Sequence, residues 1–296
     1  MEIRVLRYFL TVVREESITK AADVLHITQP TLSRQLSALE EKIGVTLFHR
    51  GSRKITLTNE GLLLRRRAEE ILDLVDKTSE ELLLQDDQIE GKITIGAGEL
   101  ASMQVVSELI GNFQKKYSRV QFEIYTATAD QVRERMERGL VDVGLLLEPV
   151  DMEKYEFVRL NVQERWVVLM CPDDELASHP EITKSKLKDR KLILPSRLNV
   201  QSELANWFGE DFDALNISYT ANLSTNAAIM VQKGYANAVV VEGAVPFWDQ
   251  NIVTSRPLSP TLTATTVLAW RRNQPFGKAT EKFIEELQCL LSMDRS

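Results

Sequence analysis

The chain has 296 residues, of which 44% are hydrophobic and 27% charged, so it can bury cores and is neither disordered nor of low complexity. Its two cysteines, Cys171 and Cys289, lie far apart, which excludes a disulfide framework and leaves no metal-ligand spacing. No run of about 18 apolar residues is present, and charges are interleaved through the first residues. The sequence therefore predicts no membrane span, no signal peptide and a cytoplasmic protein.

Charge is unevenly distributed along the chain. The net charge of −7 argues against a nucleic-acid-binding protein, yet residues 1–67 contain twelve Lys and Arg against seven Asp and Glu. Residues 68–90 contain nine acidic residues and one lysine. Positive charge confined to one end of the chain is what local contact with phosphates requires, and the acidic remainder disfavours unspecific binding elsewhere.

The first 44 residues predict three helices. An amphipathic pattern over residues 2–14 predicts the first, and Ser17 is a good N-cap for the second, over residues 18–25. A tight turn leads into the third helix, which we expect Thr28 to cap and Gly44 to end.

The third helix has one apolar face and one polar face. Leu32, Leu36 and Leu39 recur at i, i+4 and i+7, so this face points inward. The opposite face presents short hydrogen-bonding side chains and one guanidinium, from Gln29, Thr31, Ser33, Arg34 and Gln35. Glutamine can pair with adenine and arginine with guanine in the DNA major groove. The pattern favours a recognition helix, and the alternative is an ordinary helical hairpin with a solvated polar face.

Residues 47–58 follow this helix and are typical of a basic β-hairpin. Two short β-like runs flank Gly51 and Ser52, with Arg50, Arg53 and Lys54 at the tip. A basic hairpin directly after a recognition helix is a wing, whose side chains enter the minor groove or hold phosphates.

With its wing, the N-terminal segment resembles the winged helix-turn-helix of LysR-type transcriptional regulators, over about residues 1–60. The matching residues are Leu6, Phe9, Ser17, Ala21, Ala22, Leu25, Thr28, Gln29, Pro30, Leu32, Ser33, Leu39, Glu40, Gly44, Leu47, Phe48, Arg50, Leu57, Thr58 and Gly61. The resemblance implies a DNA-binding transcriptional regulator that is not an enzyme. The DNA contacts that it implies, in agreement with the polar face of the helix, are Thr28, Gln29, Pro30, Thr31, Ser33, Arg34, Arg50, Arg53 and Lys54.

A long helix is predicted from Thr58 to about residue 88. The spacing of a coiled-coil seam is followed by Leu64, Ala68, Ile71, Val75, Thr78 and Leu82. We expect this seam to pair two chains, so that two recognition helices contact half-sites about one helical turn, or a multiple, apart. The alternative is a single linker helix that packs on its own domain.

From residue 91 strands alternate with helices. The order β-α-β-α-β over residues 91–147 predicts a parallel sheet, and a second α/β set follows before a closing helix. Two lobes joined by crossing strands resemble the effector-binding domain of the same family, which is similar to a periplasmic solute-binding protein.

The predicted fold class is therefore α/β overall, in three parts. These are a winged helix-turn-helix DNA-binding domain at 1–58, a coiled-coil linker and dimerisation helix at 59–90, and a two-lobed effector-binding domain at 91–296. Lobe I covers about 91–161 and 264–296, and lobe II about 162–263. The resemblance implies the partners: double-stranded promoter DNA, RNA polymerase, a small-molecule effector, and further copies of the chain as a dimer through the linker helix and a homotetramer.

Ligands of open α/β sheets bind beyond the carboxyl ends of strands, near helix N-termini. The residues at these places are Gly98, Glu99, Ser102, Thr126, Ala127, Thr128, Pro195, Ser196, Arg197, Ser224, Thr225 and Glu242. The resemblance implies that all of them except Glu242 line the effector cleft. Helix N-termini and Arg197 favour an anion, whereas Glu99 and Glu242 argue against one. If both acids face the cleft, the ligand is cationic, neutral or absent.

Two alternatives belong to other classes of protein. Residues 96–101 fit the dinucleotide fingerprint G-x-G-x-x-G/A, which favours an enzyme with a nicotinamide cofactor. Three observations argue against it. Glu99 would lie against the pyrophosphate, and the downstream acid Glu123 lies inside its strand and not at the end of it. No histidine or cysteine is placed as a proton carrier. No enzyme activity, cofactor or metal is predicted. The second alternative is a solute receptor whose winged helix is a protein interface. DNA binding whose affinity does not change with salt concentration would favour this alternative.

Overall fold

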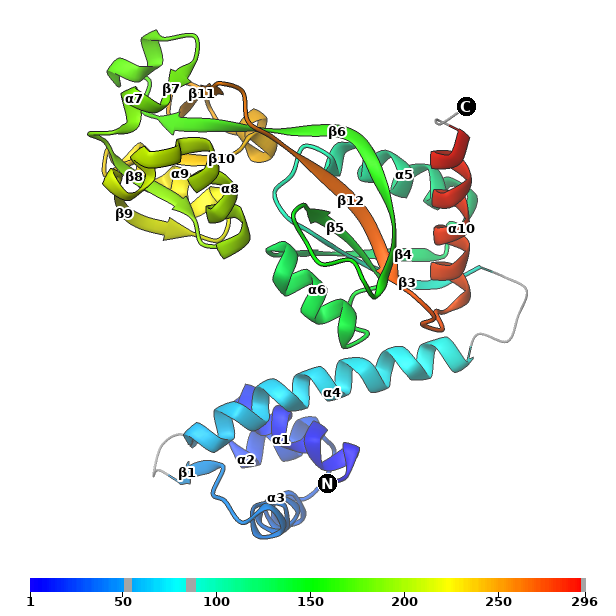
Figure 1. The fold of residues 1–296 in the computed structure, drawn as a ribbon. Helices are drawn as coiled ribbons and strands as arrows, with labels where there is room; N and C mark the ends of the chain where they lie inside the picture. Colours follow the sequence, from blue (N-terminus) through cyan, green and yellow to red (C-terminus); the bar gives the residue numbers. More distant parts are fainter. Residues whose placement is uncertain (51–54, 84–88, 294–296) are drawn as a thin grey trace. The chain divides into compact units, whose positions relative to one another are not determined.

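The computed structural model of the protein describes residues 1–50, 55–83 and 89–293 (Figure 1). The chain forms two compact units, Met1–Gln85 and Asp86–Ser296. Helices and one small hairpin make up the first unit, and a mixed α/β fold makes up the second, which confirms the predicted fold class.

The first unit is a helical domain with a two-stranded hairpin. Its elements are α1 (Ile3–Glu15), α2 (Ile18–Val24), α3 (Gln29–Ile43), β1 (Phe48–Arg50), β2 (Ile55–Leu57) and α4 (Asn59–Leu83). The core lies where α1, α2, α3 and α4 meet, and its centre is Phe9, whose side chain is completely buried. Leucines from α3 fill the space beneath it, as the spacing of that helix predicts.

Local signals set the ends of α2 and α3. The Ser17 side chain accepts a hydrogen bond from the backbone N–H of Lys20 (3.4 Å), which confirms it as the N-cap of α2. Gly44 has φ +74°, a left-handed conformation that glycine adopts without strain, and it ends α3 as predicted. Thr28 stands at the N-cap position of α3, but its hydroxyl bonds the Thr31 hydroxyl (2.8 Å) instead of a helix N–H.

Helix α4 packs its first turns on α1 of the same chain. Ala68 is completely buried and Leu72 is 8% exposed, and Leu64 packs against the same cluster. Ala68 is therefore not available to the predicted seam, because the helical core of its own unit covers it, whereas Leu64 is only half-buried. Ile71 keeps 37% of its surface exposed. The side chain of Leu82 lies outside the described residues.

The second unit alternates strands and helices. Its strands are β3 (Gly91–Ala97), β4 (Val120–Thr126), β5 (Val143–Leu147), β6 (Tyr155–Met170), β7 (Ile182–Thr183), β8 (Lys191–Pro195), β9 (Asn216–Ala221), β10 (Asn237–Val241), β11 (Thr254–Ser259) and β12 (Thr263–Arg271). Its α-helices are α5 (Met103–Lys116), α6 (Ala129–Glu137), α7 (Lys184–Leu187), α8 (Leu198–Phe208), α9 (Ser224–Gln232) and α10 (Lys278–Met293). Short 3-10 helices are η1 (Glu175–Ser178), η2 (Gly209–Ala214) and η3 (Glu242–Phe247).

Two groups of strands form the two lobes. In the first, β3 pairs in parallel with β4 and β5, as the β-α-β-α-β order predicts, and β12 joins β5 in antiparallel orientation. In the second, β8 lies between β9 and β10 and is parallel to both. The carboxyl ends of these parallel strands carry the loops that form the cleft between the lobes.

Strand β6 belongs to both lobes (Figure 1). Its first part pairs with β12, and its last residues, from Trp166 onward, pair with β10 and β11. Strand β11 was not predicted, because Arg256 and Pro257 make its sequence more typical of a loop than of a strand. Among the described residues, no helix combines the length and the apolar character needed to cross a membrane.

Candidate functional site

The polar face of α3 is exposed in the first unit. Leu32, Leu36 and Leu39 are at most 4% exposed, so the opposite face of the helix points to solvent. Of the predicted DNA contacts in α3 and its cap, Ser33 is half-buried, and the exposed ones are Thr28, Gln29, Pro30, Thr31 and Arg34. Arg34 forms no ion pair or hydrogen bond with any residue that the structure describes. The face thus presents one unpaired guanidinium among short hydrogen-bonding groups.

Helix α3 is held firmly to the elements behind it. The Glu40 carboxylate accepts a hydrogen bond from the backbone N–H of Leu47 (2.7 Å), which ties the helix to the start of the hairpin. Thr58 donates from its hydroxyl to the Thr46 carbonyl (2.7 Å) and accepts from the N–H of Gly61 (3.0 Å). A Cβ at Gly61 would stand 2.2 Å from the Leu47 carbonyl oxygen, so only glycine permits this approach of α4 to the hairpin.

The predicted wing is described only in part. Strands β1 and β2 pair in antiparallel register, with Arg50 opposite Ile55. The Arg50 side chain and the predicted tip residues Arg53 and Lys54 lie outside the described residues. The hairpin follows α3 in the order that a wing requires.

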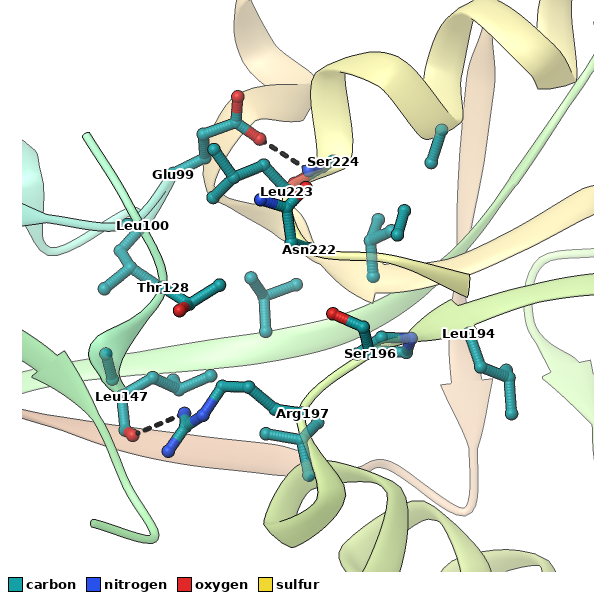
Figure 2. A pocket seen from close by; sticks show the side chains of 18 of the residues that line it. Glu99, Leu100, Thr128, Leu147, Leu194, Ser196, Arg197, Asn222, Leu223 and Ser224 are labelled. Atoms are coloured by element: carbon teal, nitrogen blue, oxygen red, sulfur yellow. Dashed lines mark hydrogen bonds between the residues drawn. The ribbon is translucent and has the colours of Figure 1, made fainter. Parts of the chain in front are cut away.

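A cavity of about 90 Å³ lies between the two lobes of the second unit (Figure 2). Loops after β3 and β4 supply the wall on one side, and loops after β8 and β9 supply it on the other. Of the predicted effector residues, those that line it are Gly98, Glu99, Ala127, Thr128, Pro195, Ser196, Arg197 and Ser224. The carboxyl ends of parallel strands thus bring together residues that are up to 126 positions apart in the chain.

The structure places four predicted effector residues outside the cavity wall. Ser102 is completely buried beneath the loop, and Thr126 is exposed at the end of β4. Thr225 points to Glu99, which its hydroxyl and its backbone N–H (3.1 Å) both contact. Glu242 forms a two-pronged ion pair with Arg165, with both nitrogen–oxygen distances 2.8 Å.

Glu99 connects the two lobes across the cleft. It follows β3 in the first lobe, and its carboxylate accepts hydrogen bonds from the first N–H groups of α9 in the second, at 2.6 Å from Ser224 (Figure 2). The start of a helix leaves N–H groups without partners and carries partial positive charge, which a carboxylate satisfies. Glu99 therefore occupies the place that an anionic ligand would take.

Arg197 forms the second connection between the lobes. Its side chain is only 9% exposed and forms an ion pair with Asp130 at the start of α6 (3.0 Å). It also donates to the carbonyl oxygens of Leu147 (3.2 Å) and Pro149 (2.9 Å), the first of which Figure 2 shows. The guanidinium that was predicted to clamp a ligand carboxylate thus clamps groups of the protein.

Glu164 is an organising residue that the sequence did not reveal. It is completely buried in β6, and its carboxylate accepts hydrogen bonds from Ala101 N (2.9 Å), Ser102 N (2.9 Å) and Ser102 Oγ (2.8 Å) at the start of α5. A dinucleotide pyrophosphate would need these same N–H groups. The fingerprint at residues 96–101 is therefore a structural loop closed by an internal carboxylate.

The remaining wall of the cavity is apolar and was also missed. It consists largely of strand residues, among them Leu145, Leu147, Trp166, Ile193 and Val239. Trp166 is 2% exposed, and its indole nitrogen has no hydrogen-bond partner within the described part of the chain. Continuous apolar runs in the sequence predict buried strands, but they do not show which side chains border an internal cavity.

Charged groups near the cleft are paired within the protein. A hydrogen bond from Arg159 lowers the pKa of Glu148 at the end of β5, and burial raises the pKa of Glu203 on α8. Neither carboxyl group lines the cavity. Within residues 1–50, 55–83 and 89–293, no group of three His, Cys, Asp or Glu side chains is placed to hold a metal ion.

Two family models match the chain. Residues 3–62 match the bacterial regulatory helix-turn-helix protein of the lysR family, and residues 86–292 match the LysR substrate binding domain. The matches cover the helix-turn-helix with its hairpin and the two-lobed unit with its cleft.

Similar proteins match nearly the whole length of the chain. It is 27% identical over 280 residues to the Hca operon transcriptional activator HcaR of Escherichia coli (strain K12), covering 93% of each protein. It is 27% identical over 294 residues to the HTH-type transcriptional regulator BsdA of Bacillus subtilis (strain 168), covering 96% of this chain and 99% of that protein. The structure of full-length CbnR complexed with its target DNA has a TM-score of 0.74 at 20% identity, over 97% of this chain and 99% of CbnR, which shows a common fold.

Proposed function

This chain belongs to the LysR family of DNA-binding transcriptional regulators, and from that membership we propose that α3 reads a promoter sequence while the cleft senses a small effector. The observation that carries the proposal is the exposed polar face of α3, with Arg34 unpaired among the described residues. Gln29, Pro30, Ser33 and Arg34 would contact bases and backbone, supported by Thr28 and Thr31. Because promoter DNA lies in the cytoplasm, that is the predicted location of the protein.

The test is binding of the purified protein to the intergenic DNA upstream of its gene and to a scrambled duplex, followed by fluorescence anisotropy across a salt series. Each phosphate contact releases counterions, so we expect tight, sequence-selective binding that weakens steeply as salt rises. Weak binding that is equal on both duplexes and flat in salt would favour the solute-receptor alternative.

Replacing Arg34 with alanine should weaken binding by about 1–3 kcal/mol and relax the preference at one base pair, if its guanidinium is bidentate to guanine. Selection from a randomised duplex library measures the preference of each variant. Arg14→Ala is the matched control, because Arg14 is an exposed arginine on α1 and its loss removes the same charge from the same unit. An unchanged base preference in Arg34→Ala would remove Arg34 from the readout.

The wing and the polymerase contact complete the proposed DNA complex. Arg50, Arg53 and Lys54 would hold phosphates or enter the minor groove beside the recognition helix. Activation or repression of transcription would depend on how the DNA-bound protein contacts RNA polymerase. An effector changes that arrangement only if it binds two states of the protein with different affinity, so a DNase footprint should differ with and without it.

We further propose that the chain dimerises through α4 and that dimers pair into a tetramer. LysR regulators form oligomers, and among the exposed apolar residues of α4, Leu63, Ile71 and Leu74 share one side of the helix. A dimer presents two copies of α3, which matches half-sites about one helical turn or a multiple apart.

Ile71→Asp should convert the dimer to monomers at micromolar concentration, because an unpaired carboxylate in an apolar interface is costly. Sedimentation velocity measures the change. Leu62→Asp is the matched control: Leu62 is 53% exposed, and nine residues along an α-helix place it about 180° from Ile71. Survival of the dimer in Ile71→Asp would assign the interface to another surface.

A further inference from the structure

The inference concerns the chemical class of molecule that the cleft binds, and it rests on the proposed role of the cleft as the effector site. The cavity measures about 90 Å³, well below the roughly 300–1,000 Å³ of pockets that hold drug-sized ligands. Strand residues such as Leu145, Ile193 and Val239 make most of its wall apolar. The small volume of the cavity and its mostly apolar wall together favour a small molecule with a largely apolar body.

Three groups that would attract an anion are already occupied. Glu99 fills the start of α9, and Glu164 fills the start of α5 with three hydrogen bonds. Arg197 is saturated by Asp130 and two carbonyl oxygens. A ligand carboxylate entering the cleft would find no unpaired cationic side chain among the described residues that line it, and it would lie beside the Glu99 carboxylate.

A cationic ligand is not favoured either. Glu99 is the one acid that lines the cavity among the described residues, and its oxygens accept three hydrogen bonds from Ser224 and Thr225. Its negative charge is therefore directed at α9. Moving a cation from water into this largely apolar cavity would cost more free energy than the attraction of this partly engaged carboxylate would recover.

One residue of the wall has a buried polar group without a partner among the described residues. Trp166 lines the cavity and is 2% exposed, and no described acceptor reaches its indole nitrogen. A buried donor without an acceptor destabilises the protein until a partner arrives. By contrast, the buried indoles of Trp207 and Trp270 donate to Pro260 O (2.8 Å) and to a Glu156 oxygen (3.2 Å).

We propose that the cleft binds a small uncharged molecule with an apolar body and one hydrogen-bond acceptor, such as a carbonyl, ether or hydroxyl oxygen, which receives the Trp166 indole N–H. Glu99 is the residue that sets this specificity, because it closes the helix start that would otherwise hold a carboxylate. The apolar wall contributes affinity and the indole orients the ligand.

The experiment uses the full chain labelled with ¹⁵N-tryptophan and records its indole N–H resonances, with the Trp166 peak assigned from the spectrum of Trp166→Phe. The probes are cyclopentanone, cyclohexanone and cyclohexanol, their charged counterparts cyclopentanecarboxylate and cyclohexanecarboxylate, and cyclohexylammonium. We expect the uncharged probes to move the Trp166 peak in a saturable manner and the charged probes to leave it in place. In Trp166→Phe, ligand-observed titration should show about fivefold weaker binding of the uncharged probes, which corresponds to one hydrogen bond.

Glu99→Ser tests the specificity role, with Glu99→Gln as the matched control that keeps the length of the side chain. Glu99→Ser should bind the carboxylate probes at least tenfold more tightly than the wild-type chain does. Movement of the wild-type Trp166 peak by the carboxylates alone, or by none of the probes, would overturn the proposal. These spectra contain no DNA, so failure of the regulator proposal is recognised separately: a probe that moves the Trp166 peak without altering any DNase footprint would overturn the effector role and leave the ligand class intact.

Discussion

Replacing Glu164 with alanine should lower the free energy of unfolding of the second unit by about 3–5 kcal/mol. Its buried carboxylate accepts three hydrogen bonds from the start of α5, and alanine leaves those donors without an acceptor at a cost of roughly 1–3 kcal/mol each, part of which an entering water would relieve. Urea unfolding followed by tryptophan fluorescence measures the change, since the four tryptophans all lie after residue 90.

Glu242→Ala is the control for this substitution. It removes a carboxylate from the neighbouring ion pair with Arg165, whose side chains are 29% and 54% exposed, so its effect should stay within about 1 kcal/mol. Glu164→Gln should fall between the two, because an amide keeps one acceptor oxygen and adds a donor. Equal midpoints for Glu164→Ala and the wild-type chain would show that the start of α5 does not depend on this carboxylate.

Phe9→Ala should destabilise the first unit by about 3–5 kcal/mol. The ring is completely buried where the helices meet and packs on Phe48 at a centroid distance of 5.3 Å, so its removal leaves a cavity under both α3 and the hairpin. A unit of about 85 residues has a stability of only some 5–10 kcal/mol, so much of it is lost. DNA binding at 37 °C should fall with it, because α3 loses its support.

Amide hydrogen exchange of peptides from residues 1–50 measures this effect without interference from the second unit. Phe9→Leu is the conservative control and should cost less than about 1.5 kcal/mol, since it keeps most of the apolar volume. Unaltered protection of α3 in Phe9→Ala would mean that the core of the unit is centred elsewhere.

The parts of the fold that the sequence predicts are those decided by neighbours in the chain. Ser17 and Gly44 act within one helical turn, and Leu32, Leu36 and Leu39 define a face by their spacing alone. The parts that were missed depend on distant partners. Glu164 bonds residues 62 and 63 positions away. The packing of Ala68 within its own chain was missed because an apolar helix face does not say which partner covers it.

The candidate site divides in the same way. Loops after parallel strands meet at one edge of a sheet, so the sequence alone was enough to place Gly98, Thr128 and Ser196 near a cleft. Residue type did not reveal direction, and Ser102 and Glu242 turned out to be engaged beneath and beside the loops. The apolar wall and Trp166 were missed because a strand residue that borders a cavity has the same sequence pattern as one that packs solidly.

The Glu99 contact with α9 has a consequence for any competing anion. A carboxylate attached to the same polypeptide faces its binding site at an effective concentration of millimolar or more. A metabolite present at micromolar concentration would therefore compete with a carboxylate whose effective concentration is about a thousandfold higher. Because that carboxylate is part of the same chain, dilution would not lower its effective concentration. Selectivity against abundant cellular acids would in this way arise from tethering, and a single substitution at position 99 would be enough to abolish it.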